Sequence, residues 1–318
     1  MNRIVFICPY FGKLPNYFDL VLESCKYNDT IDWIIFTDDR TKYMYPSNVK
    51  VYYMSFEQIQ KYIQNRIPFK IALNRPYKLC DYRPLYGYIF KAYVNGYDFW
   101  GYCDFDCIFG RIRNFLTNDI FENYNRVLCL GHMSLYNINL NKIIEFELNN
   151  NNFIKLILKN GNKSYHFDES GISLILKKYN QKTYVKSDII ADIYCLSKTF
   201  KIIKSKFSNN NNELEKNMIS KIEKKRYIFE FDNGKINGYY INNNMIKEEY
   251  MYIHLQKRPM NKEINIKNKY LIVPNKFITW KNVNIEDIKK YTKRKIFYKQ
   301  YFRIRFNNLK KRLNFIFE

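Results

Sequence analysis

The sequence is poor in glycine and proline, and it lacks any long apolar run. Its 318 residues include 10 glycines and 8 prolines, which excludes a repetitive or low-complexity architecture. No segment approaches the roughly 18 consecutive apolar residues that a membrane-spanning helix needs. The first apolar run, Ile4–Cys8, is too short for the hydrophobic region of a signal peptide. We therefore expect a globular protein that is made and kept in the cytoplasm.

Cysteine pairs with the spacing of a metal site are also missing. None of the seven cysteines forms a C-x-x-C pair. Cys103 and Cys107 are separated by three residues, and without a second Cys/His pair this spacing is not typical of zinc sites. Because the number of cysteines is odd and no secretion signal precedes them, we expect reduced and mostly buried thiols.

Positive charge is in large excess, with a formal net charge of +23. One explanation is compositional, because Lys, Asn, Ile and Tyr are frequent throughout the chain. The other is an anionic partner, such as a nucleotide-sugar, a membrane surface or a nucleic acid. Residues Ile288–Phe317 carry eleven Lys/Arg, no acid and interleaved aromatics. This pattern predicts a basic helical tail that contacts the inner face of the cytoplasmic membrane, or one whose aromatics pack on the rest of the protein.

Hydrophobic periodicity predicts an α/β fold with a mixed, mainly parallel sheet flanked by helices. The expected strands are Ile4–Cys8, Trp33–Thr37, Val49–Met54, Asp98–Cys103, Arg126–Leu130 and Tyr250–Leu255. The expected helices are Pro15–Tyr27, 56–65 with Ser55 as N-cap, Lys78–Val94 and Asp168–Tyr179. Asn233 and Gly234 favour a hairpin turn. We expect residues 1–286 to form one domain and residues 287–318 the basic tail.

The most informative segment is Tyr97–Gly110, which reads YDFWGYCDFDCIFG. An apolar run, Phe99–Cys103, meets two carboxylates one residue apart, Asp104 and Asp106. Side chains at positions i and i+2 of a strand share a face, so both would converge at the C-terminal end of a buried strand. Open α/β sheets bind their ligands at that edge. Two hard oxygen ligands suit Mg²⁺ or Mn²⁺ holding a diphosphate. The alternative is a turn with two solvated aspartates.

Eight short segments within Ile4–Arg258, about four fifths of the chain, carry a family resemblance. They are Asn16–Phe18, Phe36–Asp39, Pro76–Asp81, Tyr97–Gly101, Asp104–Asp106, Gly131–His132, Phe167–Glu169 and Tyr252–Arg258. Together they resemble an uncharacterised family of bacterial glycosyltransferase-like proteins from surface-polysaccharide gene clusters. That family looks like the GT-A class of nucleotide-sugar-dependent enzymes, which have a Rossmann-like sheet and a metal-binding Asp-x-Asp motif.

The resemblance implies a metal site that Asp104 and Asp106 begin and His254 completes. A neutral imidazole can ligate Mn²⁺ alongside carboxylates. Lys257 and Arg258 would then neutralise the diphosphate of a UDP- or GDP-linked donor. The alternative is a strand-end histidine followed by two solvated cations.

The resemblance also implies contacts to the donor. Lys78, Asp81 and Arg83 look like the Asp…Arg pair that donor-sugar-binding proteins carry just upstream of Asp-x-Asp, although the spacing here is Asp-x-Arg instead of Asp-x-x-Arg. A solvated helix end is the alternative. Asp38 and Asp39 end the second strand, where the class contacts the base or ribose; a turn or N-cap is the alternative.

Five further residues are candidates for substrate contacts. Tyr10 and Phe11 could stack on the nucleobase, although core packing is the commoner fate of aromatics. Asp168 and Glu169 begin an expected helix, where the helix dipole favours acids. In inverting GT-A enzymes an acid on the acceptor side is the general base, whereas retaining enzymes place a polar sugar-binding group there. The sequence leaves this choice open, and His132 is a weaker candidate for such a contact.

The leading hypothesis is a glycosyltransferase that moves a sugar from a nucleotide-sugar to a cell-surface polysaccharide or lipid-linked oligosaccharide. One alternative is a nucleotidyltransferase, which also uses paired aspartates and Mg²⁺. Against it, no Gly-rich phosphate loop follows the first strand. Another is a non-enzymatic protein that binds polyanions or nucleic acid because of its net charge. The sequence carries no signature of a known nucleic-acid-binding module, so we expect no nucleic-acid partner.

Overall fold

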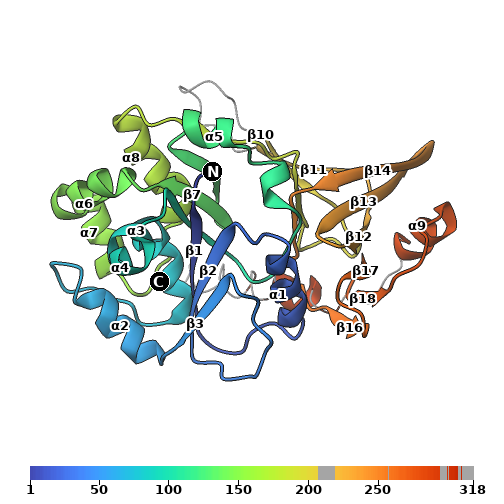
Figure 1. Cartoon of the computed structure of the whole chain (residues 1–318), viewed down its shortest axis with the longest axis horizontal. Coiled ribbons are helices and arrows are strands. Elements are labelled where there is room, and N and C mark those ends of the chain that lie inside the picture. The colour runs from blue at the N-terminus through green and yellow to red at the C-terminus, as the bar shows by residue number, and fades with distance from the viewer. Residues whose placement is uncertain (207–218, 257, 294–298, 300, 307–308, 310–318) are drawn as a thin grey trace.

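Seven strands form the main sheet of the computed structural model (Figure 1). Their spatial order is β3 (Val49–Tyr53), β2 (Ile31–Thr37), β1 (Ile4–Tyr10), β4 (Phe99–Cys103), β7 (Met133–Asn137), β6 (Arg126–Leu130) and β8 (Thr183–Tyr184). Strand β7 is antiparallel to both of its neighbours, and every other adjacent pair is parallel. The structure describes residues 1–206, 219–256, 258–293, 299, 301–306 and 309. The expected mixed α/β class with a mainly parallel sheet is confirmed.

Alternating side chains of the main sheet build two hydrophobic cores. Val5 and Ile7 of β1 point into one core, and Ile4 and Phe6 point into the other, as the two-residue period of a strand requires. The first core is covered by α2 (Phe56–Gln64), α3 (Tyr86–Ile89), α4 (Lys91–Val94), α6 (Leu140–Asn150), α7 (Asn152–Lys159) and α8 (Ile172–Lys178). The second is covered by α1 (Phe18–Lys26), α5 (Asn118–Asn123) and a further sheet.

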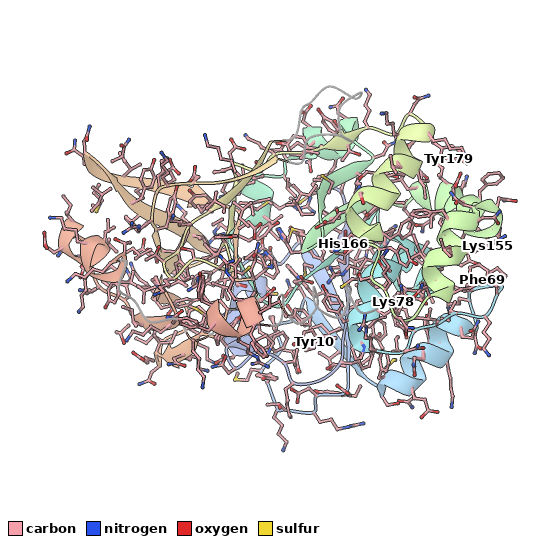
Figure 2. The ribbon with its side chains drawn as sticks, turned by 180° about the vertical axis from the view of Figure 1, so that it is seen from behind. Tyr10, Phe69, Lys78, Lys155, His166 and Tyr179 are labelled. Carbon is pink, nitrogen blue, oxygen red and sulfur yellow. The ribbon has the colours of Figure 1, made fainter. Side chains whose placement is uncertain are left out.

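The further sheet has six strands and lies at the opposite end of the molecule from the helical layer (Figure 2). Its spatial order is β14 (Asn244–Tyr250), β13 (Lys235–Asn242), β12 (Ile228–Asp232), β17 (Lys269–Val273), β18 (Lys276–Thr279) and β16 (Asn261–Glu263). The hairpin between β12 and β13 turns at Asn233 and Gly234, which both have positive φ angles. This confirms the predicted hairpin, because such turns need two residues that tolerate this conformation. Strands β10 (Ile203–Lys206) and β11 (Ile219–Ile222) pair antiparallel in a separate two-stranded sheet.

A small three-stranded sheet joins distant parts of the sequence beside the main sheet. It contains β5 (Cys107–Phe109), β15 (Tyr252–His254) and β9 (Ile190–Asp192). Strand β15 runs antiparallel to β5 and parallel to β9. The pairing places His254 opposite Cys107 on one side and opposite Asp192 on the other.

Several predicted elements have different limits in the structure. The helix expected over Lys78–Val94 is wrong as one element: Pro76–Leu85 forms 3₁₀ turns that contain Pro84, and the short α3 and α4 follow. A proline cannot donate the backbone hydrogen bond of a regular helix, which explains the tighter turns. The helix expected from Asp168 instead starts as a π-turn, Phe167–Gly171, before α8. The late strand expected over Tyr250–Leu255 is shared between the end of β14 and β15.

The last helix, α9 (Ile285–Tyr291), is anchored to the six-stranded sheet through buried Ile288. The domain boundary expected after residue 286 therefore falls inside a packed helix. Much of the predicted basic tail, 294–298 and 310–317 included, lies outside the described residues. Within the part that is described, Phe302 and Phe306 are 56% and 68% exposed. Among the described residues, no helix combines the length and apolar character that crossing a membrane requires.

Candidate functional site

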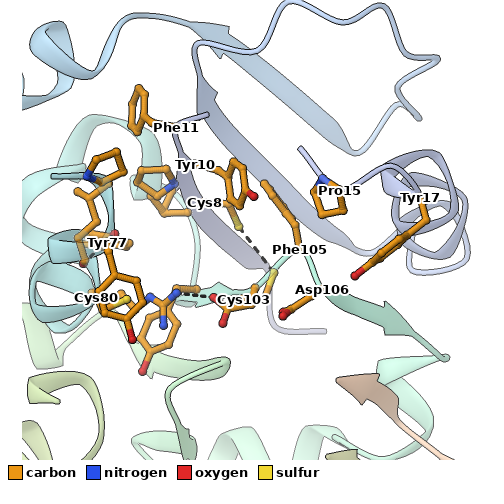
Figure 3. A pocket seen from close by; sticks show the side chains of 18 of the residues that line it. Cys8, Tyr10, Phe11, Pro15, Tyr17, Tyr77, Cys80, Cys103, Phe105 and Asp106 are labelled. Carbon is orange, nitrogen blue, oxygen red and sulfur yellow. Dashed lines mark hydrogen bonds and ion pairs between the residues drawn. The ribbon is translucent and has the colours of Figure 1, made fainter. Parts of the chain in front are cut away.

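A cavity of about 510 Å³ opens at the C-terminal ends of β1 and β4 (Figure 3). The aromatic side chains of Tyr10, Phe11 and Tyr17 form part of its wall, together with Tyr77 and Phe105. Both carboxylates of the Asp-x-Asp motif also line it, as do Arg83 and Arg258. Asp104 and Asp106 therefore follow a buried strand, as the sequence predicts, and this strand ends at a cavity.

The two carboxylates of the motif engage different partners. Asp104 lies just beyond β4, where its backbone N–H donates to the carbonyl of His132 at 3.0 Å. Its side chain accepts a hydrogen bond from Arg83. Asp106 precedes β5, and its Oδ1 lies 3.3 Å from Nε2 of His254. The small sheet explains this approach, because the backbone N–H of Leu255 donates to the carbonyl of Asp106 at 2.8 Å.

Asp106 and His254 have the geometry of two ligands of one metal ion. Two ligand atoms at right angles, each about 2.1 Å from a metal, lie about 3 Å apart. The measured separation of 3.3 Å between Asp106 Oδ1 and His254 Nε2 is close to this value. Both side chains are mostly buried, with 17% and 9% of their surface exposed. Asp104 is separated from Asp106 by one residue, but its carboxylate is bound by Arg83. Of the three predicted metal ligands, the structure therefore brings only Asp106 and His254 together.

His132 lies against His254 but is poorly placed to share a metal with it. Their rings stack with centroids 4.1 Å apart and an angle of 24° between the planes. Ring nitrogens bind metals in the plane of the imidazole, and two stacked planes do not meet at one ion. Nδ1 of His132 is also engaged by the hydroxyl of Tyr252 at 3.0 Å. His132 and Asp192 therefore support His254, and the three residues do not form a second metal site.

The two stacked imidazoles differ in charge in the metal-free protein. Burial, followed by the charge of the neighbouring cationic His254, lowers the pKa of His132 to about 3, so His132 is neutral. Burial also opposes charge on His254, but the carboxylates of Asp106 and Asp192 outweigh it and raise the pKa to about 10. A metal ion bound at Nε2 would replace the proton there, as metal binding to histidine requires.

Arg83 connects the motif to the acidic pair at the start of the π-turn. Its guanidinium donates to the carboxylates of Asp104 and Asp168 and to the carbonyl of Gly131. It also lies over the ring of Tyr102, 5.0 Å from the centroid. Burial disfavours its charge, but the carboxylates of Asp104 and Asp168 prevail and raise its pKa. Arg83 therefore lines the cavity in its positively charged form.

Asp168 and Glu169 make contacts beyond their own helix. Glu169 accepts a hydrogen bond from the N–H of Gly131 at 3.0 Å, and Asp168 accepts one from Arg83 at 3.2 Å. Neither side chain caps the turn in which it stands. Both acids nevertheless stand in the first turn of this helical segment, where the helix dipole favours them. Neither residue lines the cavity, so a role as general base stays a prediction.

Asp168 predicts a specific pH dependence of stability. Burial raises its pKa to about 6, against an unfolded value near 3.8. Between about pH 4 and pH 6 the folded protein keeps a proton that the unfolded chain has released, so the free energy of unfolding falls as pH rises. We expect Asp168→Asn to gain stability relative to the wild type by about 3 kcal/mol between pH 4 and pH 7. Urea denaturation in the presence of a chelator measures this, and a pH-independent difference would contradict it.

Asp38 and Asp39 do not reach the cavity. Asp38 accepts a hydrogen bond from the N–H of Gly12 at 2.7 Å, where φ is +97°. Asp39 is buried and accepts from Thr41 and from the N–H of Leu14. These bonds hold its pKa below the usual range, with the Thr41 hydroxyl as the largest cause. Both aspartates therefore hold the loop that follows β1, and neither lines the cavity where a ligand would bind.

Lys78 and Asp81 are also placed differently from the expectation. They form an ion pair of 2.7 Å whose side chains are both fully buried. Asp81 additionally accepts hydrogen bonds from the N–H groups of Tyr165 and Phe167, and Lys78 donates to the carbonyl of Lys163. The pair anchors the segment that leads to Asp168 (Lys78 and His166 are marked in Figure 2). The predicted contact of Lys78 and Asp81 with a donor is thus replaced by a structural role, because their side chains face the protein interior.

Of the two cations expected after His254, one can be placed. Arg258 lines the cavity, but its guanidinium is 3.0 Å from Oδ1 of Asn275 and also donates to the carbonyls of Ser197 and Lys198. Lys257 lies outside the described residues. Arg258 therefore combines a structural anchor with a position at the cavity wall.

Sequence reasoning missed Asp192. Its carboxylate accepts hydrogen bonds from His254 and Gln256, at 2.7 and 2.8 Å. The one available signal was a carboxylate inside the apolar run Ile189–Ile193. An isolated acid in a buried strand needs a partner, but the sequence does not name that partner.

Comparison with known proteins places the chain in a family without assigning it an activity. A family model described as a family of unknown function (DUF6625) matches residues 6–281, which include every site residue discussed above. A search of curated proteins finds no match. The matched region ends just before α9 and covers most of the chain. The chain belongs to the DUF6625 family.

Proposed function

We propose that the protein is a metal-dependent glycosyltransferase that transfers a sugar from a nucleotide-sugar to a cell-surface polysaccharide or lipid-linked acceptor. The observation that carries this proposal is the pairing of Asp106 with His254 at 3.3 Å, beside a cavity at the strand ends. A carboxylate and an imidazole at this separation suit Mn²⁺, and Mg²⁺ is the alternative ion.

The topology of the main sheet supports the GT-A class within this proposal. Its order β3-β2-β1-β4, with parallel pairing throughout, is the order expected of a Rossmann-type half and so supports this assignment. Antiparallel β7 follows directly beyond β4. The Asp-x-Asp motif stands at the junction between these two strands, which is where the pairing direction changes.

The cavity suits a nucleotide better than a small anion. Its volume of about 510 Å³ lies within the range of ligand pockets. Tyr10 and Phe105 are 5.6 Å apart between ring centroids and present aromatic surface for a base. Arg83, Arg258 and the carboxylates Asp104 and Asp106 line the same cavity, where a diphosphate would carry its charge. Apolar and charged surfaces are thus combined in one pocket, as a nucleotide-sugar requires.

Different residues would have different roles in the transfer. Asp106 and His254 would hold the ion, and Asp104 could add a ligand once it exchanges Arg83 for the metal. The bound ion would neutralise charge on the departing nucleoside diphosphate. Arg83 lines the cavity with 16% of its side chain exposed and offers a fixed positive charge to the same group. Asp168 is the proposed acceptor-side carboxylate, joined to this centre through Arg83.

Thermal unfolding with nucleotides tests the proposal directly. With Mn²⁺ present, we expect UDP or GDP to raise the melting temperature, because a ligand at 100 times its dissociation constant adds about 2.7 kcal/mol. Hydrolysis of a UDP- or GDP-sugar should release the nucleoside diphosphate, whereas a nucleotidyltransferase would instead release pyrophosphate from a nucleoside triphosphate when a sugar phosphate is present. No response to any nucleoside diphosphate, with folded protein and Mn²⁺, would contradict the proposal.

We also propose that the basic tail brings the protein to an anionic membrane surface. Support comes from the exposure of Phe302 and Phe306, described above, next to Arg303 and Arg305. Such a mixture of aromatic and basic residues suits a membrane interface. The full chain should sediment with anionic vesicles at low salt and be released at high salt. A chain truncated after Lys293, which keeps the packed α9, should lose this binding; equal binding would refute the idea.

A further inference from the structure

Asp192 reaches His254 through the pairing of two strands that are far apart in the sequence. Strand β9 runs parallel to β15 with Asp192 opposite His254. Oδ1 of Asp192 lies 2.7 Å from Nδ1 of His254, on the side of the ring away from Asp106. The imidazole is therefore fixed between two carboxylates. A proton kept on Nδ1 by Asp192 leaves Nε2 to face Asp106, which lines the cavity.

The carboxylate of Asp192 is itself held in place. Nε2 of Gln256 donates to the same Oδ1 at 2.8 Å, and Gln256 has a φ of +47°, a conformation that turns the chain directly after β15. His132 covers the face of the His254 ring, and Nε2 of His132 lies 3.9 Å from Oδ2 of Asp192. Both oxygens of Asp192 thus face the two imidazoles, and rotation of the His254 ring is blocked.

We propose that Asp192 is a positioning residue that orients His254 as a metal ligand and sets the preference of the site for Mn²⁺ over Mg²⁺. This inference rests on the proposed metal site. A carboxylate that accepts the second N–H of a ligating histidine fixes its tautomer and increases its basicity. Mg²⁺ binds mainly oxygen ligands and water, whereas Mn²⁺ gains more from an imidazole nitrogen. Asp192 should therefore increase the affinity of the site mainly for Mn²⁺.

The test compares Mn²⁺ and Mg²⁺ binding by wild-type protein and Asp192→Asn, measured by calorimetry without nucleotide. We expect Asp192→Asn to bind Mn²⁺ about 10–100-fold more weakly, with a clearly smaller loss for Mg²⁺. A purely structural role would weaken both ions alike, so the ratio of the two affinities is the decisive quantity. Asp188→Asn is the matched control, because Asp188 is exposed and lies four residues upstream. It should leave both affinities unchanged.

A second variant keeps the inference testable if Asp192→Asn does not fold. Gln256→Asn tolerates the positive φ angle but is one methylene too short to hold Asp192, and it should lower the Mn²⁺/Mg²⁺ affinity ratio in the same direction. Unchanged Mn²⁺ affinity in folded Asp192→Asn, or an equal loss for both ions, would overturn the role of Asp192 and leave the glycosyltransferase proposal standing. Failure of the wild-type protein to bind either ion would overturn the metal site itself.

Discussion

Asp106→Asn should reduce the metal-dependent release of nucleoside diphosphate from a UDP- or GDP-sugar by about 10²–10³-fold. The substitution keeps the size of the side chain but removes the negative charge that faces His254 Nε2 at 3.3 Å. A neutral amide is a weak ligand for Mn²⁺ or Mg²⁺, so the ion would lose one of the two groups that the fold has already brought together. Steady-state hydrolysis with saturating Mn²⁺ measures the effect.

The matched control for this variant is Asp29→Asn, which neutralises an exposed aspartate in the turn after α1. It should retain wild-type activity, and circular dichroism should show that both variants are folded. Activity of folded Asp106→Asn within a few-fold of wild type would contradict a metal role for Asp106. In that case the cavity could still bind a nucleotide, and the thermal-shift experiment would report that separately.

The sequence was informative where function depends on the end of a strand. The apolar run before Asp104 predicted β4, and the predicted parallel sheet placed the motif at the edge where the structure has its cavity. The pattern of β1 and β2 was equally clear, because both strands are buried on two faces. The sequence also predicted Ser55 as the N-cap of α2, and the structure contains the complete capping box with Gln58.

The sequence did not predict the parts of the site that depend on contacts between distant strands. Asp192 and His254 are 62 positions apart and meet because β9 and β15 pair in the small sheet. Both strands have three residues, which is too short for a periodic pattern to predict their partners. The resemblance pointed to His254, but nothing local indicated which carboxylate supports it.

Residue type alone also failed to separate buried structural charges from ligand contacts. Lys78 and Asp81 stand near Arg83 in the sequence, and a Lys or Asp at a helix end is usually solvated. The 3₁₀ turns around Pro84 direct Arg83 to the cavity but direct Lys78 and Asp81 to the interior. The hydrophobic periodicity favoured a regular helix. In such a helix, a different set of side chains would have pointed toward the cavity.

The buried pair gives the second large effect that we expect. Asp81→Asn should destabilise the folded protein by about 3–5 kcal/mol, because it leaves the buried Lys78 ammonium without a carboxylate. The double variant Lys78→Met/Asp81→Asn should recover much of this loss. It removes both charges while the amide oxygen of Asn can still accept the N–H groups of Tyr165 and Phe167. Urea denaturation monitored by fluorescence measures all three free energies of unfolding.

An exposed ion pair provides the comparison that separates burial from pairing. Lys61 and Glu57 are also 2.7 Å apart, but more than 70% of each side chain is exposed. Water and salt screen such a pair, so Glu57→Gln should leave the urea midpoint almost unchanged. If Asp81→Asn were as mild as Glu57→Gln, Lys78 would have another way to stabilise its charge, and the anchoring of the segment before Asp168 would have to come from elsewhere. If the double variant were less stable than Asp81→Asn, the aliphatic chain of Lys78 and its bond to the carbonyl of Lys163 would outweigh the cost of the buried charge.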